Sequence, residues 1–159
     1  MFEIKKIEII DEDCVKVIRD SFITVANEFN ITRENAPTNP AFIEIGSLQA
    51  MKQKGIDIYG AYINNILIGL VAIEKSNDSL YFMEKLAVLP EYRHNGYGSR
   101  LIDFVVETVK EAGGNKISIG IINENKVLKD WYIKNGFAET GIKQFPHLPF
   151  SVCFLERVV

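Results

Sequence analysis

Residues 81–112 read YFMEKLAVLPEYRHNGYGSRLIDFVVETVKEA, and the order of residues in this stretch demands an explanation beyond folding. The stretch opens as an apolar, strand-like run that ends at Leu86–Leu89 and breaks at Pro90. A polar, basic loop follows, and beyond Gly98 apolar residues recur on one helix face with charged residues opposite. The stretch therefore predicts a strand, a glycine-containing loop and an amphipathic helix.

The loop has the features of a phosphate-binding site. Because glycine lacks a Cβ, the backbone N–H groups at Gly96 and Gly98 can approach a ligand closely, and a positive φ costs little there. The first N–H groups of a helix lack internal partners and lie at the positive end of the helix dipole. Arg93 would add positive charge. The residues predicted to hold the phosphate groups are Arg93, His94, Asn95, Gly96, Tyr97, Gly98 and Ser99.

Spacing excludes two familiar phosphate loops. A Walker loop needs a lysine after its glycines, and a dinucleotide fingerprint needs a third glycine where Leu101 stands. What remains is Arg93-x-x-Gly96-x-Gly98, directly after a strand end and a proline. This pattern resembles the coenzyme A pyrophosphate loop of the GNAT N-acetyltransferase superfamily.

A second block of sequence is similar to the same family. Asn125 precedes Tyr132, and residues 131–137 read WYIKNGF, which is similar to a family pattern of the type LYxKxGF. Two blocks in the right order and separation make the resemblance specific. It covers residues 57–157, where the family's motifs are densest.

Hydrophobic periodicity predicts an order of elements that agrees with this family. The length of the chain fits a single domain, residues 1–159. The resemblance implies a mixed α/β (α+β) GNAT-like acyl-CoA N-acyltransferase fold, with a central, mostly antiparallel mixed sheet of about seven strands flanked by about four helices. The predicted strands are residues 2–10, 57–63, 66–76, 79–89, 116–122, 137–142 and 152–158, and the predicted helices are residues 12–28, 40–54, 99–112 and 126–134.

The resemblance also implies roles for individual residues. Leu86, Ala87 and Val88 would bind the pantetheine arm of acetyl-CoA through backbone groups, where two strands separate. A backbone N–H near Val88 would face the thioester carbonyl, where charge develops as an amine attacks. Asn125 would cap its helix and contact the same arm, and Tyr132 would protonate the departing thiolate. A buried strand, a helix cap and a core aromatic would explain the same residues without a ligand.

Two side chains, or water, could remove the acceptor's proton, and the sequence does not decide between them. An amine arrives as an ammonium ion, so a carboxylate or imidazole is expected to take its proton, directly or through water. Strand alternation would place Glu84 on the same sheet face as Leu86 and Val88, where burial would raise its pKa. His147, in a proline-containing loop, is the second candidate because imidazole titrates near neutrality. Either residue could instead simply face solvent.

Composition narrows the class of protein. No apolar run approaches the roughly 20 residues that a membrane span needs, and charges interrupt the first apolar residues, so a cytoplasmic protein is expected. The net charge of −3 argues against nucleic-acid binding. Cys14 and Cys153 have no metal-ligand spacing and are interpreted as small core residues, and no metal is predicted. Exposed strand edges would allow a homodimer.

The function predicted from these residues is transfer of the acetyl group of acetyl-CoA to a primary amine, by direct attack in a ternary complex. The acceptor is expected to be a small-molecule amine or a peptide amine. It should contact the first two predicted helices, residues 30–40 and residues 143–150. Three alternatives stay open: a protein or peptide N-acetyltransferase that acts on a protein N-terminus or lysine, a sensor or scaffold domain that binds acyl-CoA without turnover, and a structural domain whose glycine loop binds nothing.

Overall fold

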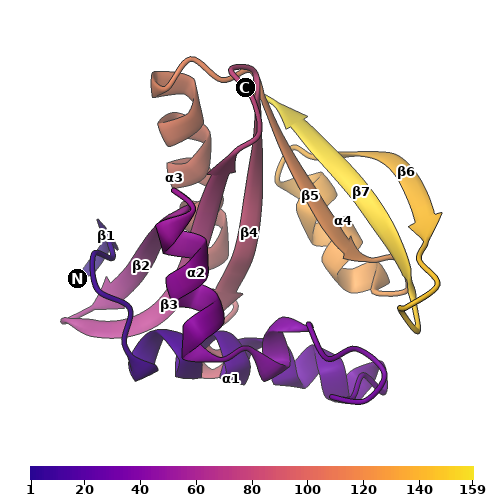
Figure 1. The fold of residues 1–159 in the computed structure, drawn as a ribbon. Coiled ribbons are helices and arrows are strands. Elements are labelled where there is room, and N and C mark those ends of the chain that lie inside the picture. The colour runs from indigo at the N-terminus through magenta and orange to yellow at the C-terminus, as the bar shows by residue number, and fades with distance from the viewer.

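The computed structural model describes all residues, 1–159, as a seven-stranded sheet with helices on both faces (Figure 1). The strand order is β1-β2-β3-β4-β5-β7-β6, and only the β4–β5 pair is parallel. This confirms the predicted mixed, mostly antiparallel sheet. The strands are β1 (Phe2–Lys6), β2 (Asp57–Ile63), β3 (Ile66–Lys75), β4 (Leu80–Val88), β5 (Lys116–Ile122), β6 (Ala138–Gln144) and β7 (Ser151–Val158). The helices are α1 (Glu12–Glu28), α2 (Ile45–Gln53), α3 (Tyr97–Glu111) and α4 (Lys126–Lys134), with single-turn 3-10 helices η1 (Pro40–Phe42) and η2 (Pro90–Tyr92).

Two elements differ from the sequence-based prediction by more than two residues. β1 ends at Lys6 because Ile7 and Ile10 bury their side chains in the core with α1 and α2 instead of extending the strand. A helix begins at Pro40, as predicted, with Asn39 as its cap, but this helix is the short η1. η1 ends at Ile43, whose backbone is extended, and α2 is a separate helix that starts at Ile45.

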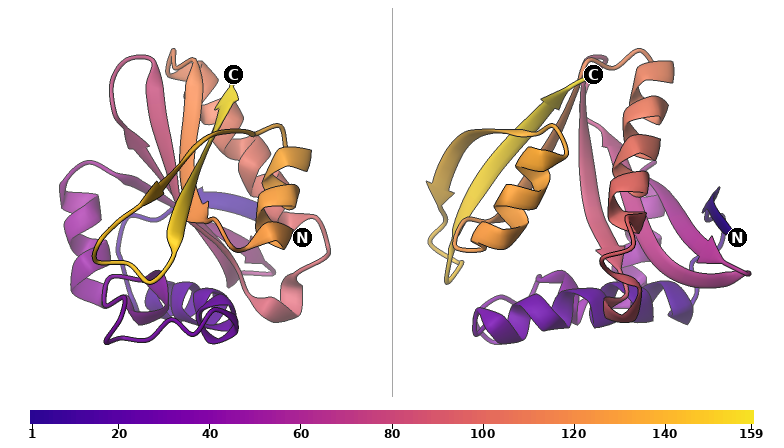
Figure 2. Two further views of the ribbon diagram at one scale, coloured as in Figure 1. Left: turned by 90° about the vertical axis from the view of Figure 1, so that its right-hand side faces the viewer. Right: turned by 180° about the vertical axis from the view of Figure 1, so that it is seen from behind.

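The sheet separates two main cores. On one face, α1 and α2 bury residues such as Ile18 and Leu48 against β2 and β3. On the other, α3 buries Leu101 and Val105, and α4 contributes Tyr132 (Figure 2). None of the helices has both the length and the apolar character needed to cross a membrane.

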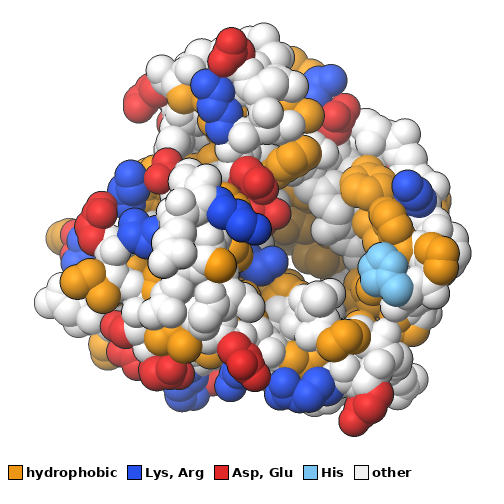
Figure 3. Space-filling model, in the orientation of Figure 1, with side chains coloured by type: hydrophobic (Ala, Val, Ile, Leu, Met, Phe, Trp, Pro, Cys, Tyr) orange, Lys and Arg blue, Asp and Glu red, His pale blue; other side chains and the backbone are white.

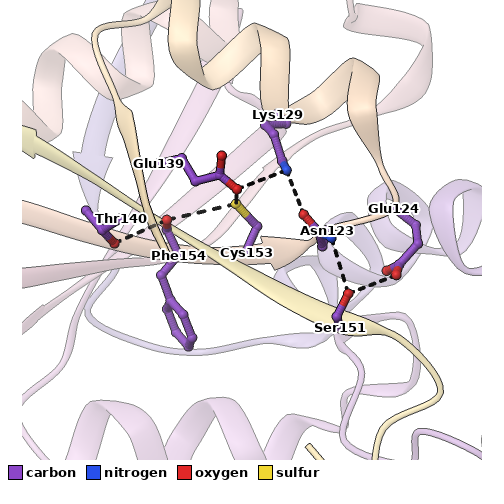
Figure 4. A network of polar contacts seen from close by, with 8 residues as sticks. All are labelled: Asn123, Glu124, Lys129, Glu139, Thr140, Ser151, Cys153 and Phe154. Carbon is purple, nitrogen blue, oxygen red and sulfur yellow. Dashed lines mark hydrogen bonds and ion pairs between the residues drawn. The ribbon is translucent and has the colours of Figure 1, made fainter. Parts of the chain in front are cut away.

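A polar network fixes α4 against the last two strands (Figure 4). Lys129 Nζ donates to Asn123 Oδ1 at 2.6 Å and to Glu139 Oε1 at 3.3 Å. The buried Cys153 thiol donates to the same Glu139 oxygen at 3.3 Å, and both cysteines are buried and unpaired, as the sequence predicted. Ser151 extends the network by accepting from Asn123. The helix that Asn125 caps and that carries Tyr132 is therefore held against β6 and β7.

Candidate active site

The strands β4 and β5 touch at one end only. Their pairing is limited to residues 80–82 with residues 116–118, beyond which the two strands separate like the arms of a V (Figure 2). Helix α1 runs across the open end. A cavity of about 850 Å³ occupies the gap and is visible as a hollow with hydrophobic walls (Figure 3). The backbone of β4 beyond Phe82 therefore has one edge free to accept an extended ligand.

β4 contains a β-bulge where it borders the cavity. Ala72 of β3 lies opposite Glu84, but Leu70 lies opposite Ala87, so β4 carries one extra residue between these pairs. The strained position is Lys85, whose φ is 56°. An inserted residue of this kind bends the strand and shifts the alternation of its side chains by one position.

Because of the bulge, Glu84 does not lie on the same sheet face as Leu86 and Val88, so that prediction was wrong. Leu86 and Val88 pack with Met83 on the side of α3 and α4. Glu84 lies opposite Ala72, whose side chain belongs to the core on the side of α1 and α2. Strict alternation assumes an unbroken strand, and the bulge breaks it between Glu84 and Leu86. Residues on both sides of the bulge still line the cavity, because it lies in the gap between the strands.

The loop before α3 presents a row of unpaired backbone donors. The N–H groups of residues 94–99 have no hydrogen-bond partner within the protein. α3 begins at Tyr97, after Gly96 in left-handed backbone with φ 82°, and His94 is also left-handed with φ 65°. Such turns let successive N–H groups converge on an anion. Of residues 94–99, all except Asn95 line the cavity, so the structure does not bring Asn95 together with the other predicted residues of the loop.

Glycine is needed at positions 96 and 98 of the loop for different structural reasons. Gly96 has open space where a Cβ would stand, and its left-handed backbone is what favours glycine. At Gly98, a Cβ would lie 2.9 Å from Cζ2 and 3.1 Å from Cη2 of Trp131 in α4. Gly98 therefore allows α4 to approach α3, a contact that the sequence did not predict.

The side chain of Arg93 is engaged within the protein. Its guanidinium donates from Nη2 to the Ser21 carbonyl oxygen at 2.7 Å and from Nη1 to Thr24 Oγ1 at 3.2 Å. Its Nε donates to the Val88 carbonyl oxygen at 3.2 Å. Burial lowers the pKa of the guanidinium, but an arginine in this environment keeps its charge. Arg93 thus ties α1 to the end of β4 and adds positive charge beside the loop.

Asn125 combines a helix cap with a free donor. The residue is 6% exposed, and its Oδ1 accepts a hydrogen bond from the Leu128 N–H at 3.2 Å, which caps α4 as predicted. Its Nδ2 makes no hydrogen bond within the protein, and the residue lines the cavity. The amide is therefore available to a ligand.

Tyr132 reaches the same cavity from the next turns of α4. Its ring is edge-on to Trp131 and Phe137, with centroids 5.0 and 5.5 Å away. The hydroxyl has no hydrogen-bond partner in the protein but keeps some accessible surface, and the residue lines the cavity. Burial raises the pKa of this phenol, so it stays protonated and can donate.

Two fully buried side-chain oxygens lack hydrogen-bond partners, and both belong to residues that line the cavity. They are Oε2 of Glu84 and Oγ of Ser21. Burial and then the nearby charge of Glu74 raise the pKa of Glu84. An unpaired buried polar atom is destabilising, so these two oxygens are costly positions in the cavity wall.

His147 is not brought together with the other candidates. It is exposed in the loop between β6 and β7, with its ring 5.8 Å from that of Phe145, and it does not line the cavity. Phe150, from the same loop, does. Of the two side chains predicted to accept a proton, only Glu84 lies in the cavity.

Sequence reasoning expected the acceptor near the first two helices without identifying residues. The cavity wall contains Ser21, Phe22 and Val25 of α1, as well as Asn39 and Pro40, but nothing from α2. The one local sequence feature that could have indicated a cavity wall here was a serine within the apolar stripe of the first predicted helix. The sequence also did not predict that Trp131 lines the cavity, because a tryptophan beside the tyrosine of the family pattern is equally consistent with a core residue.

A mixed sheet whose central parallel strands separate beside a loop of free amides is the GNAT-like acyl-CoA N-acyltransferase fold. The sequence profile described as "Acetyltransferase (GNAT) family" matches residues 21–137, and the chain belongs to this family.

Three comparisons illustrate the relationship. An uncharacterized N-acetyltransferase of Schizosaccharomyces pombe is 31% identical over 80 residues, which cover 48% of this chain and 55% of the relative, so the match spans only about half of that protein. The ribosomal-protein-S18-alanine N-acetyltransferase of Escherichia coli has a TM-score of 0.79 at 13% identity, covering 100% of this chain and 94% of that chain. The PaiA N-acetyltransferase of Thermoplasma acidophilum, solved with coenzyme A, has a TM-score of 0.74 at 23% identity, covering 100% and 99%.

Proposed function

We propose that this protein is an N-acetyltransferase that transfers the acetyl group of acetyl-CoA to a primary amine by direct attack in a ternary complex. One observation carries the proposal: the free amides of His94 and residues 96–99, the unpaired edge of β4 and the Tyr132 phenol border one cavity. Membership of the acetyltransferase (GNAT) family supports the same reaction. The acceptor is proposed to be a small-molecule or peptide amine.

The cavity residues fit acetyl-CoA. Its pyrophosphate is an anion with several acceptor oxygens, and the unpaired N–H groups at the start of α3 are donors at the positive end of a helix. Its pantetheine arm is extended and contains amides, so it can pair with the free edge of β4 as an added strand would. Asn125 Nδ2 supplies a further donor. When bound, acetyl-CoA would supply a thioester carbonyl that is activated toward amines.

The chain's own residues would position the reactants and move protons. The backbone N–H near Val88 would donate to the carbonyl oxygen as negative charge develops there. Tyr132 would donate its hydroxyl proton at the position of the sulfur, since its phenol is neutral and free of protein partners. Glu84 would take a proton from the acceptor's ammonium, because a carboxyl whose pKa is raised is a stronger base than an ordinary one.

The acceptor would enter from the side of α1. There the wall combines the apolar Phe22, Val25 and Phe150 with the carboxylates of Glu28 and Glu84. Apolar surface with negative charge suits an amine whose cationic nitrogen is attached to a hydrophobic group. The Escherichia coli protein with a similar fold is a ribosomal-protein-S18-alanine N-acetyltransferase. Peptides that begin with a small residue should therefore be among the acceptors tested.

Cofactor binding is tested by thermal-shift titration with acetyl-CoA, CoA, ATP and NAD. At a hundredfold excess over Kd, a ligand that binds only the folded state stabilises it by about 2.7 kcal/mol. For a chain of 159 residues this corresponds to a rise in Tm of about 5–11 °C. Acetyl-CoA and CoA should produce this rise and ATP and NAD should not. Equal responses to all four, or none, would contradict the cofactor assignment.

Turnover is tested by thiol release from acetyl-CoA over a panel of primary amines, amino acids and short peptides. Acceptor-dependent thiol release with an N-acetylated product identifies an enzyme. A clear thermal shift without release for any acceptor would instead support a sensor or scaffold that binds acyl-CoA.

A further inference from the structure

Glu84 has a neighbour on the adjacent strand that the proposed reaction does not yet use. In the β3–β4 ladder, Ala72 is opposite Glu84 and Glu74 is opposite Phe82. Glu74 and Glu84 are therefore diagonal neighbours on the same face of the sheet, a spacing that long side chains bridge. The charge of Glu74 is one of the causes that raise the pKa of Glu84, after burial.

The two carboxyl groups differ in their surroundings. Glu84 lines the cavity, and its Oε2 is fully buried with no partner. Glu74 does not line the cavity and is partly exposed, one residue before the exposed Lys75 at the end of β3. Together the two side chains lead from the interior of the site toward solvent.

No positive group compensates the pair fully. The charges that act on Glu84 are those of Glu74 and of Lys85, the next residue in β4. From the other elements around the cavity, Glu28 of α1 adds a negative charge, while Arg93 is bonded to α1 and β4. Two adjacent carboxylates repel each other, so a proton shared between them is favoured.

We propose that Glu74 is a positioning residue that shares with Glu84 the proton removed from the acceptor amine and releases that proton to solvent. This inference rests on the proposed function for the origin of the proton. It adds a residue outside the cavity to the machinery of proton removal, on the strand next to the one that carries Glu84.

The proton balance is as follows. The acceptor's ammonium gives one proton to the Glu84 carboxylate, so an N–H bond breaks, an O–H bond forms and the nitrogen lone pair becomes free to attack. The proton on Glu84 is hydrogen-bonded to the Glu74 carboxylate, transfers to it and leaves from there to water. Glu84 is then a carboxylate again. Acetylation of an ammonium releases one proton per turnover, and this route exports it.

The pairing is tested without any acceptor, by NMR titration of the carboxyl carbons in protein labelled at glutamate. The resonance that disappears in Glu84→Gln identifies Glu84. In the wild type, Glu84 should titrate in two coupled steps. In Glu74→Gln, it should titrate in a single step at lower pH, because a charge and a shared proton are removed. Asp78→Asn is the matched control, since it removes one carboxylate from a fully exposed position and should leave the curve unchanged.

The role in turnover is tested by the pH dependence of kcat/KM with the best acceptor of the panel. Glu74→Gln should move the acidic limb to lower pH and leave the KM for acetyl-CoA unchanged, and Glu74→Asp, which keeps the charge, should move it less. A general base contributes about 10²–10⁴-fold, and Glu84→Gln should lose that factor at neutral pH.

Each outcome decides a separate point. A Glu84 titration curve that is the same in Glu74→Gln and the wild type overturns the pair. A shared proton combined with an unmoved acidic limb overturns the export route. Absence of turnover with every acceptor overturns the proposed function, while the titration still decides whether the carboxyls share a proton. Circular dichroism and Tm confirm that each variant folds.

Discussion

Substitutions at Asn125 can separate two roles that one side chain combines. Its Oδ1 caps α4, and its Nδ2 is free in the cavity. Asn125→Ala removes both groups. Loss of an N-cap side chain costs about 1 kcal/mol. For a chain of 159 residues, this corresponds to a fall in Tm of about 2–4 °C.

Asn125→Ser retains a capping oxygen but has no amide donor. Serine and asparagine are similar N-cap residues, so Tm should stay within about 1 °C of the wild type. A neutral hydrogen bond contributes about 0.5–1.5 kcal/mol. Both variants should therefore bind acetyl-CoA about 2–13-fold more weakly.

The assays are thermal unfolding without ligand and calorimetric titration with acetyl-CoA at a temperature where all variants are folded. Serine should rescue stability but not affinity. If Asn125→Ser binds acetyl-CoA as tightly as the wild type, Asn125 is a helix cap only and its proposed contact with the cofactor is wrong. If Asn125→Ala melts at the wild-type temperature, the cap at 3.2 Å does not stabilise α4.

Three further predictions concern the other cavity residues. Tyr132→Phe should lower kcat by about 10²–10⁴-fold, because a proton donor is lost, with no change in the Kd for acetyl-CoA measured by titration. Glu84→Gln should gain stability relative to the wild type as pH rises from about 4 to neutral. The raised pKa means that folded Glu84 holds its proton above the pH at which the unfolded chain releases it, so wild-type stability falls through that window; melts across this range measure the effect. Gly98→Ala should force the Trp131 ring to move, costing about 1–3 kcal/mol by overpacking, and the fluorescence of this sole tryptophan should change.

These predictions have distinct controls. Wild-type kcat in Tyr132→Phe would leave the ring a packing role only. For Glu84→Gln, a stability difference from the wild type that is constant across the pH range would show that the carboxyl titrates alike in the folded and unfolded chain. For Gly98→Ala, Gly96→Ala is the comparison, since a Cβ at Gly96 meets nothing within 4 Å and strains only the backbone. An unchanged tryptophan spectrum in Gly98→Ala would exclude the contact with Trp131.

Much of the fold could be predicted from the sequence. The ranges of β2, β5 and α4 agree with the predicted ones, and the Asn125 cap forms as expected. The helix predicted from Pro40 was wrong because a good start signal does not specify how long a helix continues. There the chain turns at Ile43, and α2 has no side-chain cap of its own.

Only part of the site could be predicted, because only part of it depends on residues that are close together in the sequence. The amides of residues 94–99 and the Asn125 cap were predictable, because each depends on residues only a few positions away. The orientation of Glu84 was not, because the bulge at Lys85 depends on how β4 pairs with β3. The exclusion of His147 from the cavity likewise depends on where a long loop folds.

The sequence by itself determined the order of the elements, most of their bounds, the Asn125 cap and the row of free amides before α3, since hydrophobic period, glycine and capping act over a few residues. Only the tertiary structure decided that Arg93 bonds to Ser21 and that Gly98 lies against Trp131. It also decided that Glu84 lies beside Glu74. These contacts join residues on different elements, and their geometry is fixed only when the sheet, its bulge and the helices that cover it pack together.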